Sequence, residues 1–204
     1  MTLYIIILTV LVSIIALNNS DINYRFRFTP YMIHTEKQWY RFFTHALVHA
    51  DWMHLAINMF VLYSFGRQVE QYFAFFFGGK AAYYFVLMYV GGTVFSSVSS
   101  YIRYSNEPYY HAVGASGAVS AIVFSSIVLD PLAKLGFLFL PIPMPAFLFG
   151  IIYLIYSAYM AKKGHDNIGH DAHFWGAIFG VLFTIALQPS LAMRFISMIS
   201  GNGG

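Results

Sequence analysis

Hydrophobic residues in this chain are grouped in long unbroken stretches, and polar residues are concentrated between them. Unbroken apolar runs are typical of membrane-spanning helices, whereas the strands of an outer-membrane barrel alternate apolar and polar residues. A helix needs about 20 mostly apolar residues to cross a bilayer. We therefore predict six spanning helices, each near that length, at about residues 2–18, 52–73, 80–101, 115–130, 144–161 and 171–189.

The connections between these segments differ in character. Residues 19–51 mix charged residues with aromatic ones, which are favoured at a membrane interface, so we predict a long interfacial first loop. The segment PLAKLGFLFLPIPMP (131–145) is apolar but contains four prolines, which predicts a kinked or re-entrant connection. Residues 1–17 lack the basic start and small-residue cleavage site of a signal peptide, so we interpret them as a retained first helix.

Composition supports a membrane protein. The 204 residues are 59% hydrophobic and only 9% charged, against about 25% charged residues in a typical soluble domain. The net charge of +3 contains no basic block, so no nucleic-acid partner is expected, and the absence of cysteine excludes a disulfide framework. We predict one all-α, multi-pass integral membrane domain, residues 1–204, with the lipid bilayer as its surroundings.

The distribution of cations gives an orientation. With six spans, the odd-numbered loops carry seven cations, Arg25, Arg27, Lys37, Arg41, Arg103, Lys162 and Lys163. The even-numbered loops and the tail carry Arg67, Lys80, Lys134 and Arg194. The positive-inside rule then favours a cytoplasmic location for the odd-numbered loops.

Strongly polar side chains inside spanning helices are costly and by default indicate a functional site. The second segment contains HLAIN, which places His54 and Asn58 four residues apart on one helical face. Ser116 lies at the start of the fourth segment, and His173 lies in the sixth. These four residues are the candidate chemistry of the chain.

Small residues could bring two of these segments together. Gly176 and Gly180 follow His173 at three and seven residues, on one stripe of the helix. The fourth segment offers Gly117 and Ala121 on a similar face. If these faces pack, Ser116 and His173 come within reach of each other, as a nucleophile and its base must. Alone, such a serine is more often a packing residue, and such a histidine is often a structural hydrogen bonder.

In their order and spacing, these motifs resemble those of the rhomboid intramembrane serine proteases, of the bacterial type with a core of six transmembrane helices. The sequence GASG (114–117) resembles the family's GxSG nucleophile motif, and AHFWGAIFG (172–180) resembles its AHxxGxxxG motif. HLAIN (54–58) is similar to the family's HxxxN, and FFTHALVHADWMH (42–54) to the stretch before it. GRQVE (66–70) is similar to the glycine and glutamate at the far end of the same helix.

The resemblance implies a six-helix rhomboid-like bundle and a protease that needs no cofactor. Ser116 would be the nucleophile and His173 the general base of a Ser–His dyad. Oxyanion and substrate binding would fall to His54, Asn58, Gly114 and Gly117, while His45 and His49 would be structural. The substrates would be transmembrane segments of other proteins, reaching the site past the fifth helix and beneath a cap formed by residues 162–171.

The resemblance also implies a cytoplasmic N-terminus and an active site facing outside, in the inner membrane if the protein is bacterial. This orientation is opposite to the one given by the charge count. A cytoplasmic N-terminus is preferred, because the resemblance extends over the whole core, whereas four of the seven cations lie in the single long first loop.

Two positions depart from the family pattern. Tyr40 occupies the place of a tryptophan that often precedes the arginine corresponding to Arg41. Ser120 stands where many members carry an aromatic residue that stacks on the catalytic imidazole, so another group must support His173, with a hydrogen bond from Ser120 as one option. Asp171 should point away from His173, since two residues correspond to about 200° around a helix. Asp166, in the preceding loop, stays an alternative as the residue that orients the His173 ring.

Two other functions compete with the protease. The segment GHDNIGHDAH (164–173), which includes His165 and His170, is rich in potential ligands and would suit zinc in a metal-dependent hydrolase, although no HExxH motif is present. A non-catalytic binder of membrane helices could use the same fold, but it would not need the intact pair of Ser116 and His173.

Overall fold

The computed structural model describes residues 1–137, 140–163 and 169–201, and these are mostly helical. The elements follow in the order α1 (Thr2–Leu17), α2 (Ser20–Phe26), α3 (Pro30–Glu36), α4 (Arg41–Thr44), η1 (His45–Leu47), α5 (Trp52–Phe77), η2 (Gly78–Lys80), α6 (Ala81–Tyr104), α7 (Ser116–Leu129), β1 (Lys134–Phe137), β2 (Leu140–Pro145), α8 (Ala146–Lys163), α9 (His170–Leu187) and α10 (Ser190–Ile199).

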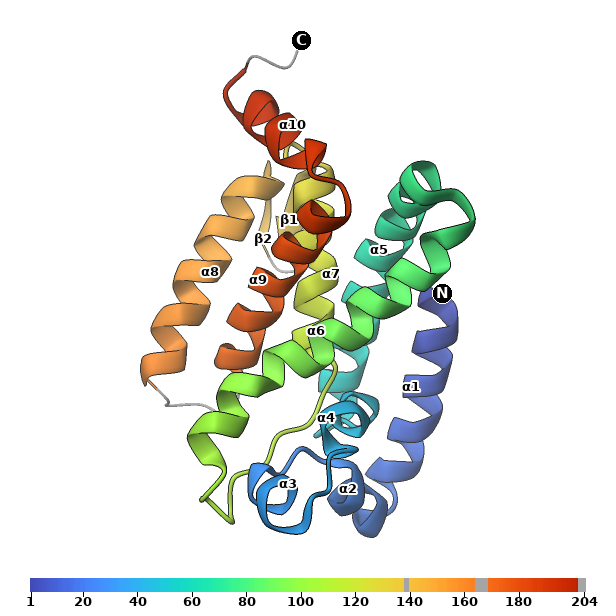
Figure 1. The fold of residues 1–204 in the computed structure, drawn as a ribbon, viewed down its shortest axis with the longest axis vertical. Helices are drawn as coiled ribbons and strands as arrows, with labels where there is room; N and C mark the ends of the chain where they lie inside the picture. Colours follow the sequence, from blue (N-terminus) through green and yellow to red (C-terminus); the bar gives the residue numbers. More distant parts are fainter. Residues whose placement is uncertain (138–139, 164–168, 202–204) are drawn as a thin grey trace.

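Helix α7 is the centre of the bundle. Every residue from 117 to 129 is buried, and the helix is enclosed by α5, α6, α8 and α9. Its sequence SGAVSAIVFSSIVL is apolar or small on all sides, as expected of a helix without a solvent-facing stripe. Helix α6 crosses the bundle diagonally, while α1 lies beside α5 at the opposite side from α8 (Figure 1).

The six predicted apolar segments coincide with α1, α5, α6, α7, α8 and α9. By length and composition, two stretches of the described chain suit a bilayer crossing: the continuous helical stretch Trp52–Tyr104, which contains α5 and α6, and α9. Helices α1 and α7 are apolar but shorter, with 16 and 14 residues. The helical positions are therefore confirmed, and the number of crossings stays a prediction.

The connection at 131–145 differs from the predicted kinked segment, because it forms an antiparallel β-hairpin. Lys134 pairs with Pro145, and Leu135 pairs with Met144. Proline cannot donate to a β-ladder and is therefore found on edge strands. In a sheet of two strands each strand is an edge, so β2 tolerates prolines that would break a helix.

Helix α10 was not predicted as an element, because its ten residues are too few to span a bilayer. It packs against α7 and α9 at the upper end of the bundle (Figure 1). Leu191 is buried, whereas Met193, Ile196 and Ile199 are exposed. An exposed apolar stripe on a terminal amphipathic helix is typical of a helix that lies at a membrane surface.

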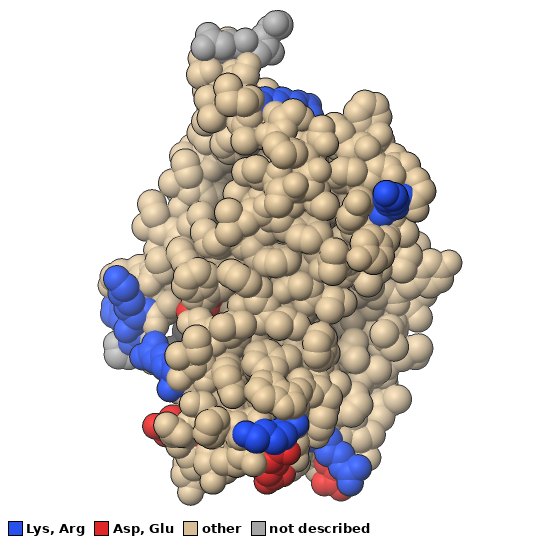
Figure 2. Space-filling view, viewed as in Figure 1, with Lys and Arg blue, Asp and Glu red and all other residues tan. Residues whose placement is uncertain are grey.

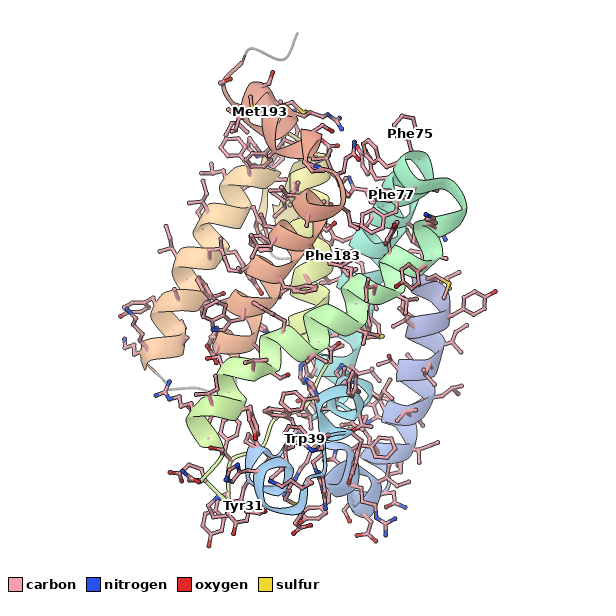
Figure 3. The ribbon with its side chains drawn as sticks, in the orientation of Figure 1. Tyr31, Trp39, Phe75, Phe77, Phe183 and Met193 are labelled. Carbon is pink, nitrogen blue, oxygen red and sulfur yellow. The ribbon has the colours of Figure 1, made fainter. Side chains whose placement is uncertain are left out.

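The long first loop is a folded unit, built from α2, α3, α4 and η1. Arg41 is only 1% exposed and donates hydrogen bonds of 2.8 Å to the carbonyl oxygens of Tyr24 and Arg27. Its Nε donates to Gln38 Oε1 at 2.7 Å. Tyr31 and Trp39 lie in this unit at the lower end of the bundle, while Phe75 and Phe77 lie at the upper end of α5 (Figure 3).

Two buried histidines connect this loop to the helices. His45 Nδ1 lies 2.9 Å from the Arg41 carbonyl oxygen, and its Nε2 lies 3.3 Å from Ser97 Oγ on α6. His49 Nδ1 lies 2.9 Å from Ser13 Oγ on α1. Burial lowers the pKa of His45 to about 4, and burial together with the nearby His54 ring lowers the pKa of His49 to about 3. Both rings are therefore neutral near pH 7.

The outer surface of the bundle suits a lipid environment. Large apolar side chains are exposed along α1, including Leu3, Tyr4, Ile7, Leu8 and Leu11. On the face drawn in Figure 2, charged side chains lie toward the lower end and up the left side to mid-height, a few more lie toward the upper end, and most of the remaining surface is uncharged. Exposed apolar side chains in this number are typical of a surface that contacts a membrane or another apolar partner.

The closest helix crossing in the core joins α7 to α9. A Cβ atom added at Gly176 would collide with the carbonyl group of Gly117, and one added at Gly180 would collide with that of Ala121. The two backbones are therefore in direct contact at two points that lie about one helical turn apart. This confirms the predicted packing of small residues on the fourth and sixth apolar segments.

We expect Gly180→Ala to lower the stability of the protein in detergent, because its methyl group would displace the Ala121 backbone. Overpacking of this kind typically costs about 1–3 kcal/mol. Gly79→Ala is the matched control, because nothing lies within 4 Å of a Cβ at that position. Thermal unfolding measures both variants; an equal midpoint for Gly180→Ala and the wild type would contradict the close crossing.

Acidification should also destabilise the fold. The pKa values of His45 and His49 are below the value of about 6.5 expected in the unfolded chain. Between these values the unfolded chain binds more protons, so their contribution to stability is present above about pH 6.5 and is lost as the pH falls toward 4. The thermal midpoint should be lower at about pH 5 than at about pH 7.5.

Substitution separates this effect from other titrations. His45→Gln should weaken the dependence of the midpoint on pH, whereas His34→Gln, at an exposed position, should leave it as in the wild type. A wild-type midpoint that stays constant or rises on acidification would show that these histidines are not buried in their neutral form.

Candidate active site

Ser116 is the first residue of the central helix α7. The preceding turn depends on Gly114, whose φ of +111° is rarely adopted by residues with a side chain. A Cβ at Gly114 would lie 2.6 Å from His54 Cε1, so this glycine also allows the backbone to approach the imidazole of α5. Gly114 therefore joins two of the predicted site residues, Ser116 and His54, through backbone geometry.

The first loop holds this turn in place. The Gly114 N–H donates to the His45 carbonyl oxygen at 3.0 Å, and the Ala115 N–H donates to His49 Nε2 at 3.5 Å. Ser13 Oγ already donates to the Leu47 carbonyl oxygen, so His49 Nδ1–H must donate to Ser13 and leave Nε2 as an acceptor. A protonated His49 would present a second donor to the Ala115 N–H, so the turn before Ser116 requires the neutral ring.

His173 lies in the first turn of α9, where its N–H donates to the Gly169 carbonyl oxygen at 3.0 Å. It precedes Gly176, the residue in contact with the Gly117 carbonyl, by three positions. A Cβ at Gly117 would also lie 3.5 Å from the Ala172 carbonyl oxygen. The backbones that carry Ser116 and His173 thus meet within one helical turn of both residues.

The His173 ring is flanked by aromatic groups. Tyr153 of α8 lies nearly parallel to it, with ring centroids 6.2 Å apart and planes inclined by 28°. His170 approaches at 5.9 Å with planes inclined by 80°. Ser120, the position where the family pattern has an aromatic residue, is hydrogen-bonded to Tyr153, with 3.0 Å between the two hydroxyl oxygens.

Asp171 takes part in a separate contact. Its Oδ2 accepts a hydrogen bond from Ser100 Oγ of α6 at 3.3 Å, and Ser100 in turn accepts one from the Tyr110 hydroxyl. This agrees with the expectation that Asp171 points away from His173. Asp166 and His165 lie outside the described residues, as does half of the cap predicted at 162–171.

Helix α5 contributes the polar pair His54 and Asn58. Asp51 begins this helix as its N-cap, because its Oδ1 accepts from the His54 N–H at 2.7 Å. Asn58 is 5% exposed, and its Nδ2 donates to the His54 carbonyl oxygen at 2.9 Å. An amide nitrogen carries two hydrogens, so Asn58 has the capacity to donate a second hydrogen bond. The His54 ring lies 5.0 Å from that of His49.

Gly66 and Glu70, at the far end of α5, hold α1 against the bundle. A Cβ at Gly66 would lie 2.8 Å from Thr2 Oγ1, and Glu70 Oε1 accepts from the Thr2 N–H at 3.0 Å. This contact begins about three helical turns along α5 from His54. Its role is in packing.

Sequence reasoning missed Ser13 and Tyr153. Ser13 lies in an apolar run, and its contact with His49 depends on how α1 docks beside the loop. Tyr153 is one of several aromatic residues in FLFGIIYLIYSAY, and only the rotation of α8 selects it. Ser120 stands where many family members have an aromatic residue, which indicated that another group must pack against His173. The sequence could not identify that group.

The described residues contain no group of three or more His, Asp, Glu or Cys side chains that could hold a metal ion. Part of the segment predicted as an alternative metal site, 164–168, lies outside them. The ring nitrogens of His45 and His49 form hydrogen bonds with serine hydroxyl and backbone groups.

Comparison with known proteins identifies the family of the chain. A sequence model described as "Rhomboid domain" matches residues 36–190. RHOMBOID-like protein 12, mitochondrial, of Arabidopsis thaliana is 31% identical over 145 residues, which cover 66% of this chain and 42% of the relative. Rhomboid-like protein 11, chloroplastic, of the same plant is 30% identical over 177 residues, covering 80% of this chain and 58% of the relative.

The chain thus spans about half the length of these curated relatives. Their names refer to a mitochondrion and a chloroplast, which gives no support to the expected bacterial inner membrane or bacterial subtype. The domain match covers three of the site's helices, α5, α7 and α9, together with most of the rest of the chain. The chain belongs to the membrane-integral rhomboid family.

Proposed function

We propose that this protein is an intramembrane serine endopeptidase that uses Ser116 as nucleophile and His173 as general base. Its substrates are transmembrane segments of other proteins, and its six apolar helices α1, α5, α6, α7, α8 and α9 cross the bilayer. The observation that carries the proposal is the backbone contact between Gly117 and Gly176. Ser116 adjoins the first of these glycines, and His173 precedes the second by one turn.

In the first step, Ser116 Oγ attacks the carbonyl carbon of the scissile peptide while His173 accepts the hydroxyl proton. A serine hydroxyl is a weak nucleophile without such a base, and imidazole is basic and neutral near pH 7. The imidazolium then transfers the proton to the leaving amine as the C–N bond breaks. Water, deprotonated by the same ring, hydrolyses the acyl-enzyme and restores Ser116.

Negative charge on the carbonyl oxygen needs hydrogen-bond donors. The start of α7 provides backbone N–H groups, including that of Ser116, that have no partner within the helix. Asn58 offers its second amide hydrogen, and His54 lies against the Gly114 backbone of the same turn. These three donors form the proposed oxyanion site, and Gly114 and Gly117 allow the close approach of His54 and of α9 on which this site depends.

The substrate must unwind before it reacts, because a helical peptide bond is shielded by its own hydrogen bonds. Glycine and proline near the cleaved bond lower the cost of unwinding. We place the N-terminus in the cytoplasm and the site toward the outside. Arg41 is buried and bonded to loop carbonyl groups, so one of the seven cations that favour the opposite orientation is part of a folded core.

We expect Ser116→Ala and His173→Ala each to reduce cleavage of a transmembrane substrate by at least about 10³-fold, because neither residue acts without the other. Asn58→Ala should cost about 10²-fold as one oxyanion donor is lost. Ser64→Ala and His111→Ala, at exposed positions, are the matched controls and should retain full activity. Gel analysis of cleavage by purified protein, with thermal midpoints for folding, provides the measurement.

The alternatives give different results in the same assay. Full activity of folded Ser116→Ala would end the assignment of a serine protease. Loss of wild-type cleavage on treatment with EDTA would favour the metal-dependent hydrolase. A folded wild-type protein that binds transmembrane segments but cleaves none would be a rhomboid-like binder.

The orientation has a test of its own. With a cytoplasmic N-terminus and six crossings, a reporter fused after Gly204 should be cytoplasmic, because an even number of crossings places both ends on one side. A reporter accessible from outside would contradict either the orientation or the number of spans. Reporters placed after Lys80 and Lys163 distinguish the two, since they should read as cytoplasmic and external, respectively.

A further inference from the structure

The His173 ring packs against an aromatic residue from a different helix. Tyr153 of α8 lies nearly parallel to the imidazole, with centroids 6.2 Å apart and an inclination of 28°. This is the offset-stacked arrangement that aromatic pairs prefer. His173 is also approached edge-on by His170, so the ring is bounded on two sides.

Tyr153 is itself held by contacts from α7 and α8. Its hydroxyl oxygen lies 3.0 Å from Ser120 Oγ, and Ser120 is buried one helical turn after Ser116. The tyrosine ring packs against Phe124 of α7, with centroids 5.6 Å apart, and against Phe149 of α8, at 5.8 Å. Three contacts thus fix the position and the tilt of this ring.

A general base that accepts a proton from one atom and delivers it to another must keep its orientation through both steps. The proposed mechanism assigns no third residue to this task. The plane of Tyr153 restricts rotation of the imidazole, and its electron-rich face stabilises the imidazolium formed when Ser116 attacks. The hydrogen bond between Ser120 and Tyr153 ties the position of the tyrosine ring to that of α7, the helix that carries Ser116. Tyr153 in turn packs against His173, the proposed base for Ser116.

We propose that Tyr153 is a positioning residue for His173, and that Ser120 aligns Tyr153 through the hydroxyl contact. This inference rests on the proposed function, because it assigns a catalytic consequence to a contact with the proposed base. Ser120 is then the partner of an aromatic group supplied by α8. The ring absent from position 120 is replaced by the ring of Tyr153.

Kinetics with a transmembrane substrate test the role. Tyr153→Leu should lower kcat about tenfold with KM unchanged, the loss expected for one stacked aromatic contact. Ser120→Ala and Tyr153→Phe should each lower kcat about threefold, and the double variant no further, because both remove the same hydrogen bond. Tyr159→Leu, at an exposed position of the same helix, is the matched control and should behave as the wild type.

A second measurement reports the contact without catalysis. In protein with isotope-labelled histidine, the His173 ring signal, identified by its loss in His173→Ala, should be displaced by the ring current of Tyr153. The displacement should disappear in Tyr153→Leu and persist in Tyr153→Phe and Tyr159→Leu. An unchanged signal in folded Tyr153→Leu would overturn the contact. If Tyr153→Leu does not fold, equal and non-additive losses in the two hydroxyl variants support the inference, and full activity of both overturns it.

The two proposals fail in different ways. If cleavage depends on Ser116 but Tyr153→Leu retains the wild-type kcat, the positioning role is wrong and the proposed protease stands. If the His173 signal responds to Tyr153 but no Ser116-dependent cleavage occurs, the proposed function is wrong, and the catalytic role of Tyr153 is overturned with it.

Discussion

The direct contact between the backbones of α7 and α9 is the constraint on which the rest of this structure depends. Gly176 lies against the Gly117 carbonyl group and Gly180 against that of Ala121, so no side chain separates the two helices. In lipid, where apolar helices gain little from leaving their surroundings, such close packing is a main source of helix association. The same contact fixes the height of the first turn of α7 relative to the first turn of α9.

The polar groups around this crossing are organised as a neutral network. His45 and His49 use backbone and serine partners, and their low pKa values, caused by burial, keep them uncharged near pH 7. Through the N–H groups of Gly114 and Ala115, this network fixes the turn that leads into Ser116. The folded first loop therefore holds the backbone that leads into Ser116, in addition to connecting α1 to α5.

Much of the architecture could be predicted from the sequence, because apolar runs and small-residue spacing report directly on helix positions and on the α7–α9 crossing. The hairpin β1–β2 was interpreted as a kinked connection, since prolines exclude a helix but do not by themselves specify strand pairing. Helix α10 was missed because a short amphipathic helix gives no spanning signal. The support of His173 by Tyr153 could not be predicted, because it depends on the rotation of α8 about its axis.

The most direct test of the account is the site at which a fluorophosphonate reacts, since this reagent needs an activated serine but no knowledge of the substrate. Peptide mass spectrometry of the labelled wild-type protein should locate a single adduct on Ser116, and His173→Ala should remove it. An adduct confined to another serine, or equal labelling of Ser116 when His173 is replaced, would show that positions 116 and 173 do not act as a pair.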